Sequence, residues 1–436
     1  MRTVTFQKLI DAGLLQIGDG YRAKLAELGG SGFPFLRAEF VDHRYISFET
    51  AECFHKELAS KLASKLSRAG DTVITTKGNS TGCAAYVQRD VRTFVYSPHL
   101  SFWRSLDTDK LNPDFLREWA HSPEFIDQLN GMKDSTDMAP YMSLTDQRRL
   151  RISLPEPTDQ RSIAHVLGVL DDKIASNRRM NRTLEEMAAA LFRSWFVDFD
   201  PVVRNAEKKT GAQKVPSLGK SQTAPFQALD KLFPDAFQDS ELGPIPKGWR
   251  EGLLSDEIDL AYGKALKEED RQTGEIPVYG SNGQVGWHNR CLASGPGIIV
   301  GRKGNAGTVT WSPDDFFAID TTFYVIRTDQ QYGWHFLFHS LQQQDFEALT
   351  ADSAVPGLNR NVALHNSMVL PPHNVAAHFE NVVDPWWRQI AHNVRESQTL
   401  AALRDTLLPK LLSGEVRVKN MEAAFKNTLS QAKGSS

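Results

Sequence analysis

The sequence of 436 residues has few cysteines, no long apolar run and almost no net charge. Cys53, Cys83 and Cys291 are widely spaced, so we expect neither a disulfide framework nor a zinc site, and the cytoplasm is the expected location. No apolar stretch reaches the roughly 18 residues of a membrane span, and the N-terminal segment lacks the apolar core of a secretory signal. The net charge of −3 argues against binding of nucleic acid by bulk positive charge.

The usual signatures of catalysis are also missing. The tetrapeptide DPWW at 384–387 is similar to the Asp-Pro-Pro-aromatic loop of amino-methyltransferases, but it lacks the second proline and falls inside a helical repeat. The tetrapeptide NPDF at 112–115 is typical of a helix start, with Asn112 as the N-cap and Pro113 in the first turn. Neither is accompanied by a glycine-rich loop of the kind that binds S-adenosylmethionine.

Two further motifs are incomplete. The glycine-rich segment 301–308 lacks the Gly-Lys-Ser/Thr ending of a nucleotide-binding P-loop. His335 and His339 have the spacing of a zincin, but Phe336 stands where a zincin has its glutamate, so we interpret both histidines as packing residues. These absences favour a binding subunit over an enzyme.

The chain contains an internal repeat. The segment that starts at Thr136 matches the segment that starts at Asp352, with a constant offset of 216 residues and no gap. In both copies seam residues recur with alternating spacings of four and three, which is the heptad pattern of a coiled coil. The first seam consists of Ile163, Leu167, Leu170, Ile174, Asn177, Asn181, Leu184, Ala188 and Leu191. The second consists of Phe379, Val383, Trp386, Ile390, Asn393, Ser397, Leu400, Arg404, Leu407 and Leu411.

These seams predict two long helices of about 35 residues, or about 50 Å. Prolines at 155 and 157, and at 371 and 372, indicate where the helices begin. Asn177 and Asn393 occupy the same seam position, where a buried amide sets register at a cost in stability. Antiparallel pairing would relate the two halves by a pseudo-two-fold axis. Parallel pairing and two ordinary core helices are the alternatives.

A weaker repeat precedes each helix. GDTVITTKGNSTGCAAYV, from Gly70, resembles GPGIIVGRKGNAGTVTWS, from Gly295, and both predict a strand, a Lys-Gly-Asn turn and another strand. We therefore predict an α+β fold with two globular domains and two long helices. The expected boundaries are a first domain at 1–155, a helix at 156–200, a linker at 201–245, a second domain at 246–372, a helix at 373–418 and a flexible tail at 419–436.

The two Lys-Gly-Asn turns are the best candidates for recognition chemistry. Lysine and arginine suit phosphate or guanine, and asparagine suits adenine; solvated hairpin turns are the competing interpretation. The candidates in the turns are Lys77, Asn79, Ser80 and Thr81 in the first, and Arg302, Lys303, Asn305 and Thr308 in the second. Weaker candidates, some of which could equally cap local backbone, are Ser281, Asn282, Asn359 and Arg360.

The run LPEPTDQRSIAHVLGVLDDKIASNRRMNRTLEEMAAALFRSWFVDFDPV, from Leu154, resembles the central conserved region of specificity subunits of Type I restriction-modification systems. SELGPIPKGW, IPVYGSNGQVGWHN, AVPGLNRN and LLPKLLSGEV are similar to further segments of that family. The resemblance extends from about residue 15 to residue 418. One departure between the two halves is Met142-Ser143, where the second copy has Leu358-Asn359.

The resemblance implies a non-catalytic, cytoplasmic subunit that recognises a bipartite, asymmetric double-stranded DNA target. Each of two target-recognition domains would read one half-site, and an antiparallel coiled coil would set the gap. Two modification subunits would use S-adenosylmethionine to methylate adenine, and restriction subunits would cleave with ATP and Mg, so that this chain binds no cofactor or metal itself. The alternatives from the residues are a single-chain DNA methyltransferase and a coiled-coil interaction scaffold.

Overall fold

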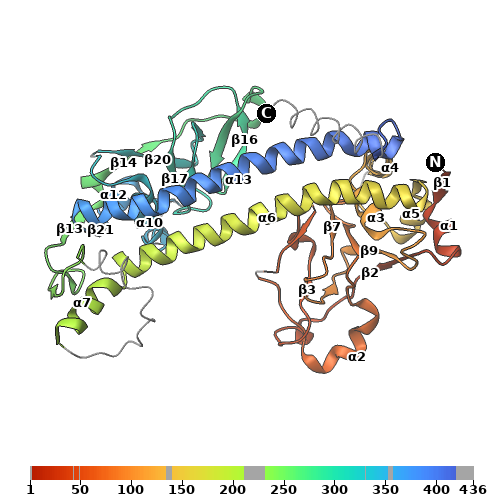
Figure 1. The fold of residues 1–436 in the computed structure, drawn as a ribbon, viewed down its shortest axis with the longest axis horizontal. Coiled ribbons are helices and arrows are strands. Elements are labelled where there is room, and N and C mark those ends of the chain that lie inside the picture. The colour runs from red at the N-terminus through yellow and green to blue at the C-terminus, as the bar shows by residue number, and fades with distance from the viewer. Residues whose placement is uncertain are drawn as a thin grey trace, which may run out of the picture. The chain divides into compact units, whose positions relative to one another are not determined.

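A computed structural model describes residues 2–42, 44–48, 50–133, 140–210, 231–328, 330–351 and 357–418. Outside these residues lie the predicted tail at 419–436, the middle of the predicted linker at 201–245, and the repeat starts at Thr136 and Asp352. The chain divides into two compact units (Figure 1). Unit 1 comprises 1–176 together with the chain from 396 onward, and unit 2 comprises 177–395. Both mix helices and sheets, as the α+β prediction requires.

Unit 1 is built on an antiparallel sheet of four strands in the order β2-β9-β6-β7. β6 and β9 are buried along almost their whole length, which fits their runs of Val, Ile, Leu, Phe and Trp. Trp103 on β9 lies in the core with Phe6 and Trp119, whose rings are 4.9 and 5.8 Å away. The strands are β1 (Arg2–Thr5), β2 (Leu15–Asp19), β3 (Phe35–Leu36), β4 (Val41–Asp42), β5 (Tyr45–Ile46), β6 (Thr72–Thr75), β7 (Ala84–Tyr86), β8 (Val95–Tyr96), β9 (Leu100–Ser105) and β10 (Arg151–Leu154).

Unit 2 repeats this plan, with a four-stranded sheet in the order β14-β20-β17-β18. A two-stranded ladder of β13 and β21 corresponds to the ladder of β1 and β10. A second sheet, β16-β15-β19, is added. The strands are β11 (Phe237–Gln238), β12 (Ile245–Pro246), β13 (Arg250–Leu253), β14 (Ile258–Tyr262), β15 (Ile276–Gly280), β16 (Gly283–His288), β17 (Gly297–Gly301), β18 (Val309–Ser312), β19 (Phe317–Ala318), β20 (Thr322–Arg327) and β21 (Ser367–Leu370).

The short helices that begin at Leu144 and at Arg360 lie at matching places of the repeat. Asn112 caps the helix that begins at Pro113, as predicted, by accepting a hydrogen bond from the Phe115 amide at 2.9 Å. The predicted linker is partly structured: it contains α7, and Phe233 is buried in the core of unit 2. The short helices are α1 (Phe6–Asp11), α2 (Ala59–Leu62), α3 (Pro113–Trp119), α4 (Pro123–Lys133), α5 (Leu144–Arg149), α7 (Asp200–Thr210), α9 (Leu254–Glu257), α10 (Trp334–Gln342), α11 (Ala348–Ala351) and α12 (Arg360–Leu364).

Two long helices run through both units: α6 (Pro157–Phe196) has 40 residues and α13 (His373–Ser413) has 41. Both lie within the predicted bounds of 156–200 and 373–418, and α6 ends where Trp195 and Phe196 are buried in the core of unit 2. Gly414, in the left-handed conformation at φ 77°, ends α13. Every residue of the two predicted seams is buried or half-buried, so the seams are the core-facing stripes of the helices.

Within each unit the two helices run in opposite directions. In unit 1, Lys173 on α6 pairs with Glu396 on α13, and Asp171, which precedes Lys173, pairs with the later residue Arg404. In unit 2 the Asn177 amide donates to the Asn393 carbonyl at 3.4 Å, and the Trp195 ring stacks on His378. None of the helices in the described ranges is long and apolar enough to cross a membrane.

The Asn393 side chain provides a test of the buried seam. Its Nδ2 donates to Asn181 Oδ1 at 2.8 Å, and its Oδ1 accepts from Gln389 Nε2 at 2.8 Å. We expect Asn393→Leu to destabilise the protein by about 1–3 kcal/mol, because Asn181 loses its partner inside the seam. Urea unfolding measures the change, and Gln398→Leu, at an exposed position of the same helix, is the control. Equal stability of the two variants would contradict a structural role for the buried amide.

Candidate nucleic-acid interface

The first Lys-Gly-Asn turn follows β6 and is closed at its base by backbone hydrogen bonds. The Thr75 amide donates to the Cys83 carbonyl at 2.9 Å, and the Thr75 carbonyl accepts from the Gly82 amide at 2.8 Å. The amide of Thr76, the next residue, donates to the His99 carbonyl at 2.8 Å, and the Thr76 carbonyl accepts from the Met142 amide at 3.0 Å. The loop is therefore tied both to the start of β9 and to the chain that leads into α5.

The second turn follows β17 and is closed in the same way. The Gly301 amide donates to the Thr308 carbonyl at 2.8 Å, and the Gly301 carbonyl accepts from the Gly307 amide at 2.8 Å. Gly301 therefore takes the place of Thr75 in unit 1.

The residue after each of these positions is tied identically as well. The backbone amide of Arg302 donates to the Thr321 carbonyl, and the backbone carbonyl of Arg302 accepts from the Leu358 amide, both at 2.8 Å. These bonds correspond to those that Thr76 makes with His99 and Met142. The structure therefore pairs Lys77 with Lys303 and Asn79 with Asn305, and Arg302 with Thr76.

Glycines allow the turns to form. Gly78 and Gly304 have φ of 88° and 77°, and Gly82 and Gly307 have φ of 92° and 88°. These left-handed conformations favour glycine because it has no Cβ. Each turn needs glycine at two positions, and Gly78 and Gly304 are the central residues of the repeated Lys-Gly-Asn pattern.

Most of the candidate side chains in the turns face solvent. Lys77, Asn79 and Ser80 are exposed in unit 1, and Lys303, Asn305 and Thr308 are exposed in unit 2. Thr81 is instead buried, and its hydroxyl lies 2.6 Å from the Gly78 carbonyl oxygen and 3.0 Å from that of Pro140. Thr81 therefore holds the loop to the neighbouring chain.

Arg302 is half-buried and is held by an aromatic partner that sequence reasoning missed. Its guanidinium carbon lies 4.9 Å from the ring centre of Tyr262 and 5.8 Å from that of Phe323. Tyr262 is the last residue of β14 and is 54% exposed. A cation held over an aromatic face keeps its charge while losing part of its mobility, so Arg302 is preorganised at the edge of the turn. No spacing signal in the sequence connects Tyr262 with Arg302.

The hairpin between β15 and β16 brings Ser281 and Asn282 to the second turn. Ser281 Oγ lies 3.2 Å from the position that a Cβ atom on Gly304 would occupy. Asn282, at the tip of the hairpin, is exposed. Two of the candidate segments therefore meet at one place in unit 2.

Asn359 caps a helix. Its side-chain oxygen accepts from the amides of Asn361 at 2.9 Å and Val362 at 3.3 Å, at the start of α12. Ser143 holds the same position in the repeat and caps α5 in the same way, by accepting from the Asp146 amide. The difference between Met142-Ser143 and Leu358-Asn359 therefore preserves the local structure.

Arg360 also makes contacts within the unit. It forms an ion pair with Asp259, and its Nε donates to the Leu260 carbonyl at 2.8 Å. These contacts join α12 to β14, beside the strand end that carries Tyr262.

The motif at 384–387 is helical and lies within α13. Trp387 is buried and stacks on His335, with ring centres 5.3 Å apart and planes at 9°. Burial lowers the pKa of His335 and of His339 to about 4, so both are neutral packing residues at neutral pH. Among the described residues, no group of three or more His, Cys, Asp or Glu side chains is placed to hold a metal ion.

Two curated proteins are similar along most of the chain. The Type I restriction enzyme HindI specificity subunit of Haemophilus influenzae is 24% identical over 413 residues, which cover 81% of this chain and 88% of that protein. The Type I restriction enzyme MjaIX specificity subunit of Methanocaldococcus jannaschii is 22% identical over 442 residues, which cover 95% and 94%. The curated homologues are Type I restriction enzyme specificity subunits. The resemblance identified from the sequence is confirmed.

A solved structure agrees with this relationship at the level of the fold. The crystal structure of a Type-I restriction-modification system S subunit from M. genitalium matches with a TM-score of 0.53 and 15% identity, covering 94% of this chain and 95% of that specificity subunit. No protein-family model matches the chain.

The buried titratable groups of unit 2 predict a dependence of stability on pH. Histidine in an unfolded chain has a pKa near 6.5, whereas His335 and His339 have a pKa of about 4 in the folded state. Between about pH 6.5 and 4 these two histidines therefore bind more protons in the unfolded chain than in the folded one. The stability of the folded protein falls as the pH falls through this range. Burial raises the pKa of Glu380 from 4.5 to about 7. On acidification, Glu380 is therefore protonated in the folded state at a higher pH than in the unfolded chain. Between pH 7 and 4.5 this protonation stabilises the folded protein and partly offsets the loss of stability caused by the two histidines.

We expect His339→Leu to reduce the loss of stability on acidification. One of the two acid-sensitive groups is removed, so between pH 7 and 5 the variant should lose about 1–2 kcal/mol less than the unmodified protein. Thermal unfolding across this pH range measures the effect. His392→Leu, at an exposed position of α13, is the matched control. Identical pH profiles for all three proteins would show that His339 does not titrate on unfolding.

Proposed function

We propose that the chain is the non-catalytic DNA-specificity subunit of a Type I restriction-modification complex and recognises an asymmetric target made of two half-sites. One observation carries this proposal. The same loop, closed by the same four backbone hydrogen bonds, follows equivalent strands β6 and β17 in two different units. One chain thus presents two recognition loops with a common framework, a shared Lys-Gly-Asn sequence and different side chains around it.

The exposed chemistry of these loops suits DNA. Lys77 and Lys303 can contact phosphate or guanine, and Asn79 and Asn305 can contact adenine edges. Arg302, held against Tyr262, adds a preorganised cation in unit 2. The glycines at the turns let the backbone approach a groove closely.

The long helices would form an antiparallel coiled coil that sets the gap between half-sites. Their heptad seams are buried, and the contacts within each unit run in opposite directions along the two helices. One helical turn corresponds to about 5.4 Å, compared with about 3.4 Å for one base pair. A change of helix length is therefore large enough to change the gap.

The catalytic chemistry would belong to partner chains in the cytoplasm. Two modification subunits would bring S-adenosylmethionine and methylate adenine, and restriction subunits would use ATP and Mg to cleave. This chain would bind double-stranded DNA and those subunits, and no cofactor or metal. Its net charge of −3 fits a complex in which the partners share the contact with DNA.

Two other functions have weaker support. A single-chain DNA methyltransferase would need a catalytic loop, but the candidate segment at 384–387 lies inside α13. A coiled-coil scaffold without a DNA role would leave the duplicated, exposed Lys-Gly-Asn turns without a purpose. Binding of S-adenosylmethionine by the purified chain alone would favour the methyltransferase.

Matched pairs of substitutions test the two loops. We expect Lys77→Ala with Asn79→Ala to weaken reading of one half-site, and Lys303→Ala with Asn305→Ala to weaken reading of the other. Each lost base contact should cost about 1–3 kcal/mol. Lys209→Ala, at an exposed surface ion pair with Asp235, is the control.

The measurement is the adenine methylome of the host with the gene deleted and then restored as the normal or the variant chain. Deletion should remove methylation at one bipartite motif, and each double variant should relax or abolish recognition at a different half. If both double variants affect the same half, the assignment of one loop to each half-site is wrong. An unchanged methylome on deletion, in a host whose partner subunits are expressed, contradicts the specificity role.

Lengthening the helices tests the gap. We expect four residues inserted after Ser176 in α6 and after Asn393 in α13 to change the length of the unspecified gap, because both helices grow by about 6 Å at about 1.5 Å per residue. The sequences of both half-sites should stay the same. Methylome sequencing reads both properties at once, and a changed half-site sequence would argue against a spacing role.

A further inference from the structure

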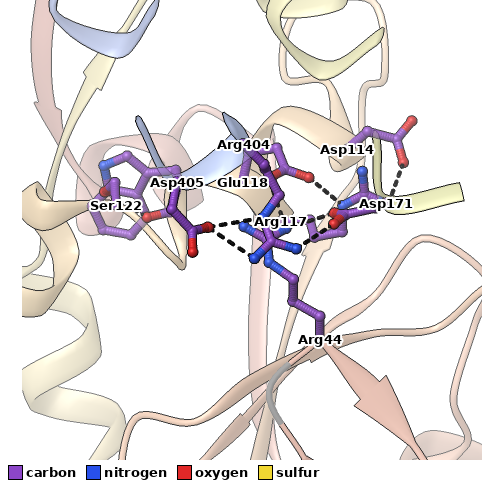
Figure 2. A network of polar contacts seen from close by, with 9 residues as sticks. Arg44, Asp114, Arg117, Glu118, Ser122, Asp171, Arg404 and Asp405 are labelled. Atoms are coloured by element: carbon purple, nitrogen blue, oxygen red, sulfur yellow. Dashed lines mark hydrogen bonds and ion pairs between the residues drawn. The ribbon is translucent and has the colours of Figure 1, made fainter. Parts of the chain in front are cut away.

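The globular part of unit 1 joins the long helices through a buried network of charges (Figure 2). Asp171 on α6 accepts from Arg44 Nη1 at 2.7 Å and from Arg404 Nη1 on α13 at 2.6 Å. Arg44 also pairs with Glu118 on α3 at 2.9 Å. The four side chains are between 0 and 13% exposed. Asp171 thus connects the recognition domain to both helices at one point.

Arg117 extends the network on the other side of Glu118. Its Nε donates to Glu118 Oε1 at 2.7 Å, and its guanidinium stands 3.3 Å from the position that a Cβ atom on Gly168 would occupy. Burial acts to lower the pKa of Arg117, but attraction to Glu118 and Asp171 outweighs it and the pKa is raised. Arg117 therefore keeps its charge in the network, and α6 has a glycine where the arginine approaches it.

Arg44 is held in the network by an unusual backbone conformation. Arg44 has φ of 73°, a left-handed conformation that is unfavourable for a residue with a long side chain. Its amide donates to the Ala84 carbonyl at 2.8 Å, which holds the chain in place beside β7. Strain of this kind persists where the surrounding contacts over-determine the conformation.

Unit 2 has uncharged residues at the equivalent positions of the helix pair. The offset of 216 residues places Trp387 where unit 1 has Asp171, and Ala188 where the helix pair of unit 1 has Arg404. Trp387 packs on His335, Phe338 and Trp311, each with ring centres 5.3 Å away. Ala188 is fully buried. At these equivalent positions, one recognition domain therefore contacts the helices through ions and the other through aromatic rings.

These two surfaces are incompatible with each other. An ionic domain surface placed against Trp387 and Ala188 would bury Arg44 without its helix partner Asp171. An aromatic domain surface placed against Asp171 and Arg404 would leave those two charges desolvated and without Arg44. Each domain is thus complementary to only one end of the helix pair.

We propose that Asp171 with Arg404, and Trp387 with Ala188, are positioning residues that make each end of the helix pair accept its own recognition domain and reject the other. The consequence for DNA rests on the proposed function: a recognition domain moved to the other end would read its half-site there only if these residues are exchanged with it. The docking itself does not depend on it.

A chimera tests the proposal. In the full-length chain, residues 1–154 are replaced by a copy of 231–370, because Leu154 and Leu370 occupy the same repeat position directly before the helix prolines. One version keeps Asp171 and Arg404, and the other carries Asp171→Trp with Arg404→Ala. We expect amide hydrogen exchange in the transplanted domain to be at least about tenfold slower in the second version. Lys173→Ala, at the exposed Lys173–Glu396 pair, is the control and should give no rescue.

The reciprocal change checks the result without a transplant. Asp171→Trp with Arg404→Ala in the unmodified chain should accelerate exchange in 2–133 and leave unit 2 protected, and Asp171→Asn should do so to a smaller degree. Equal protection of the two chimeras, or an undisturbed unit 1 in the reciprocal variant, would overturn the proposal. Neither hydrogen-exchange measurement involves DNA. If only the proposed function is wrong, the second chimera will still show slower exchange, but the methylation of the host DNA will not change. If both hold, the rescued chimera should direct methylation to a target with two inverted copies of the second half-site.

Discussion

Burial of the two heptad seams is the constraint on which the rest of the structure depends. α6 and α13 each present one narrow stripe of seam residues, and in each unit those stripes are covered by the other helix and by the globular part. The seams would be exposed on isolated helices, and helices of this length are stabilised mainly by packing of such a face. The globular parts therefore have to dock on the helices, and the place of docking is set by which residues of the stripe they meet.

Duplication explains how the two units share one loop framework. The strand order, the four hydrogen bonds around each Lys-Gly-Asn turn and the capped helix after it recur in both units. Backbone bonds depend little on side-chain identity, apart from the glycines at positive φ. Side chains next to the shared Lys-Gly-Asn sequence can therefore diverge, as Thr76 has from Arg302, without loss of the loop.

The docking surfaces have diverged further than the loops. Unit 1 buries arginines and carboxylates that need one another, and unit 2 buries tryptophan, histidine and phenylalanine rings. A buried ion pair is a weak source of net stability but strongly penalises a wrong partner, whereas an aromatic cluster gains stability from area and shape. The same position in a repeat can thus provide discrimination in one copy and packing energy in the other.

Local and periodic features were determined by the sequence alone. The long helices, the start of α3 at Pro113, the turns at Gly78 and Gly304 and the family resemblance follow from spacing, capping residues and glycines, which act over a few residues along the chain. The packing of Trp195 and Phe196 in the core of unit 2, the burial of Thr81, the stacking of Arg302 on Tyr262 and the meeting of Arg44 with Asp171 were decided only by the tertiary structure. Each of these depends on residues distant in the sequence, and such pairs leave no periodic signal in a single chain.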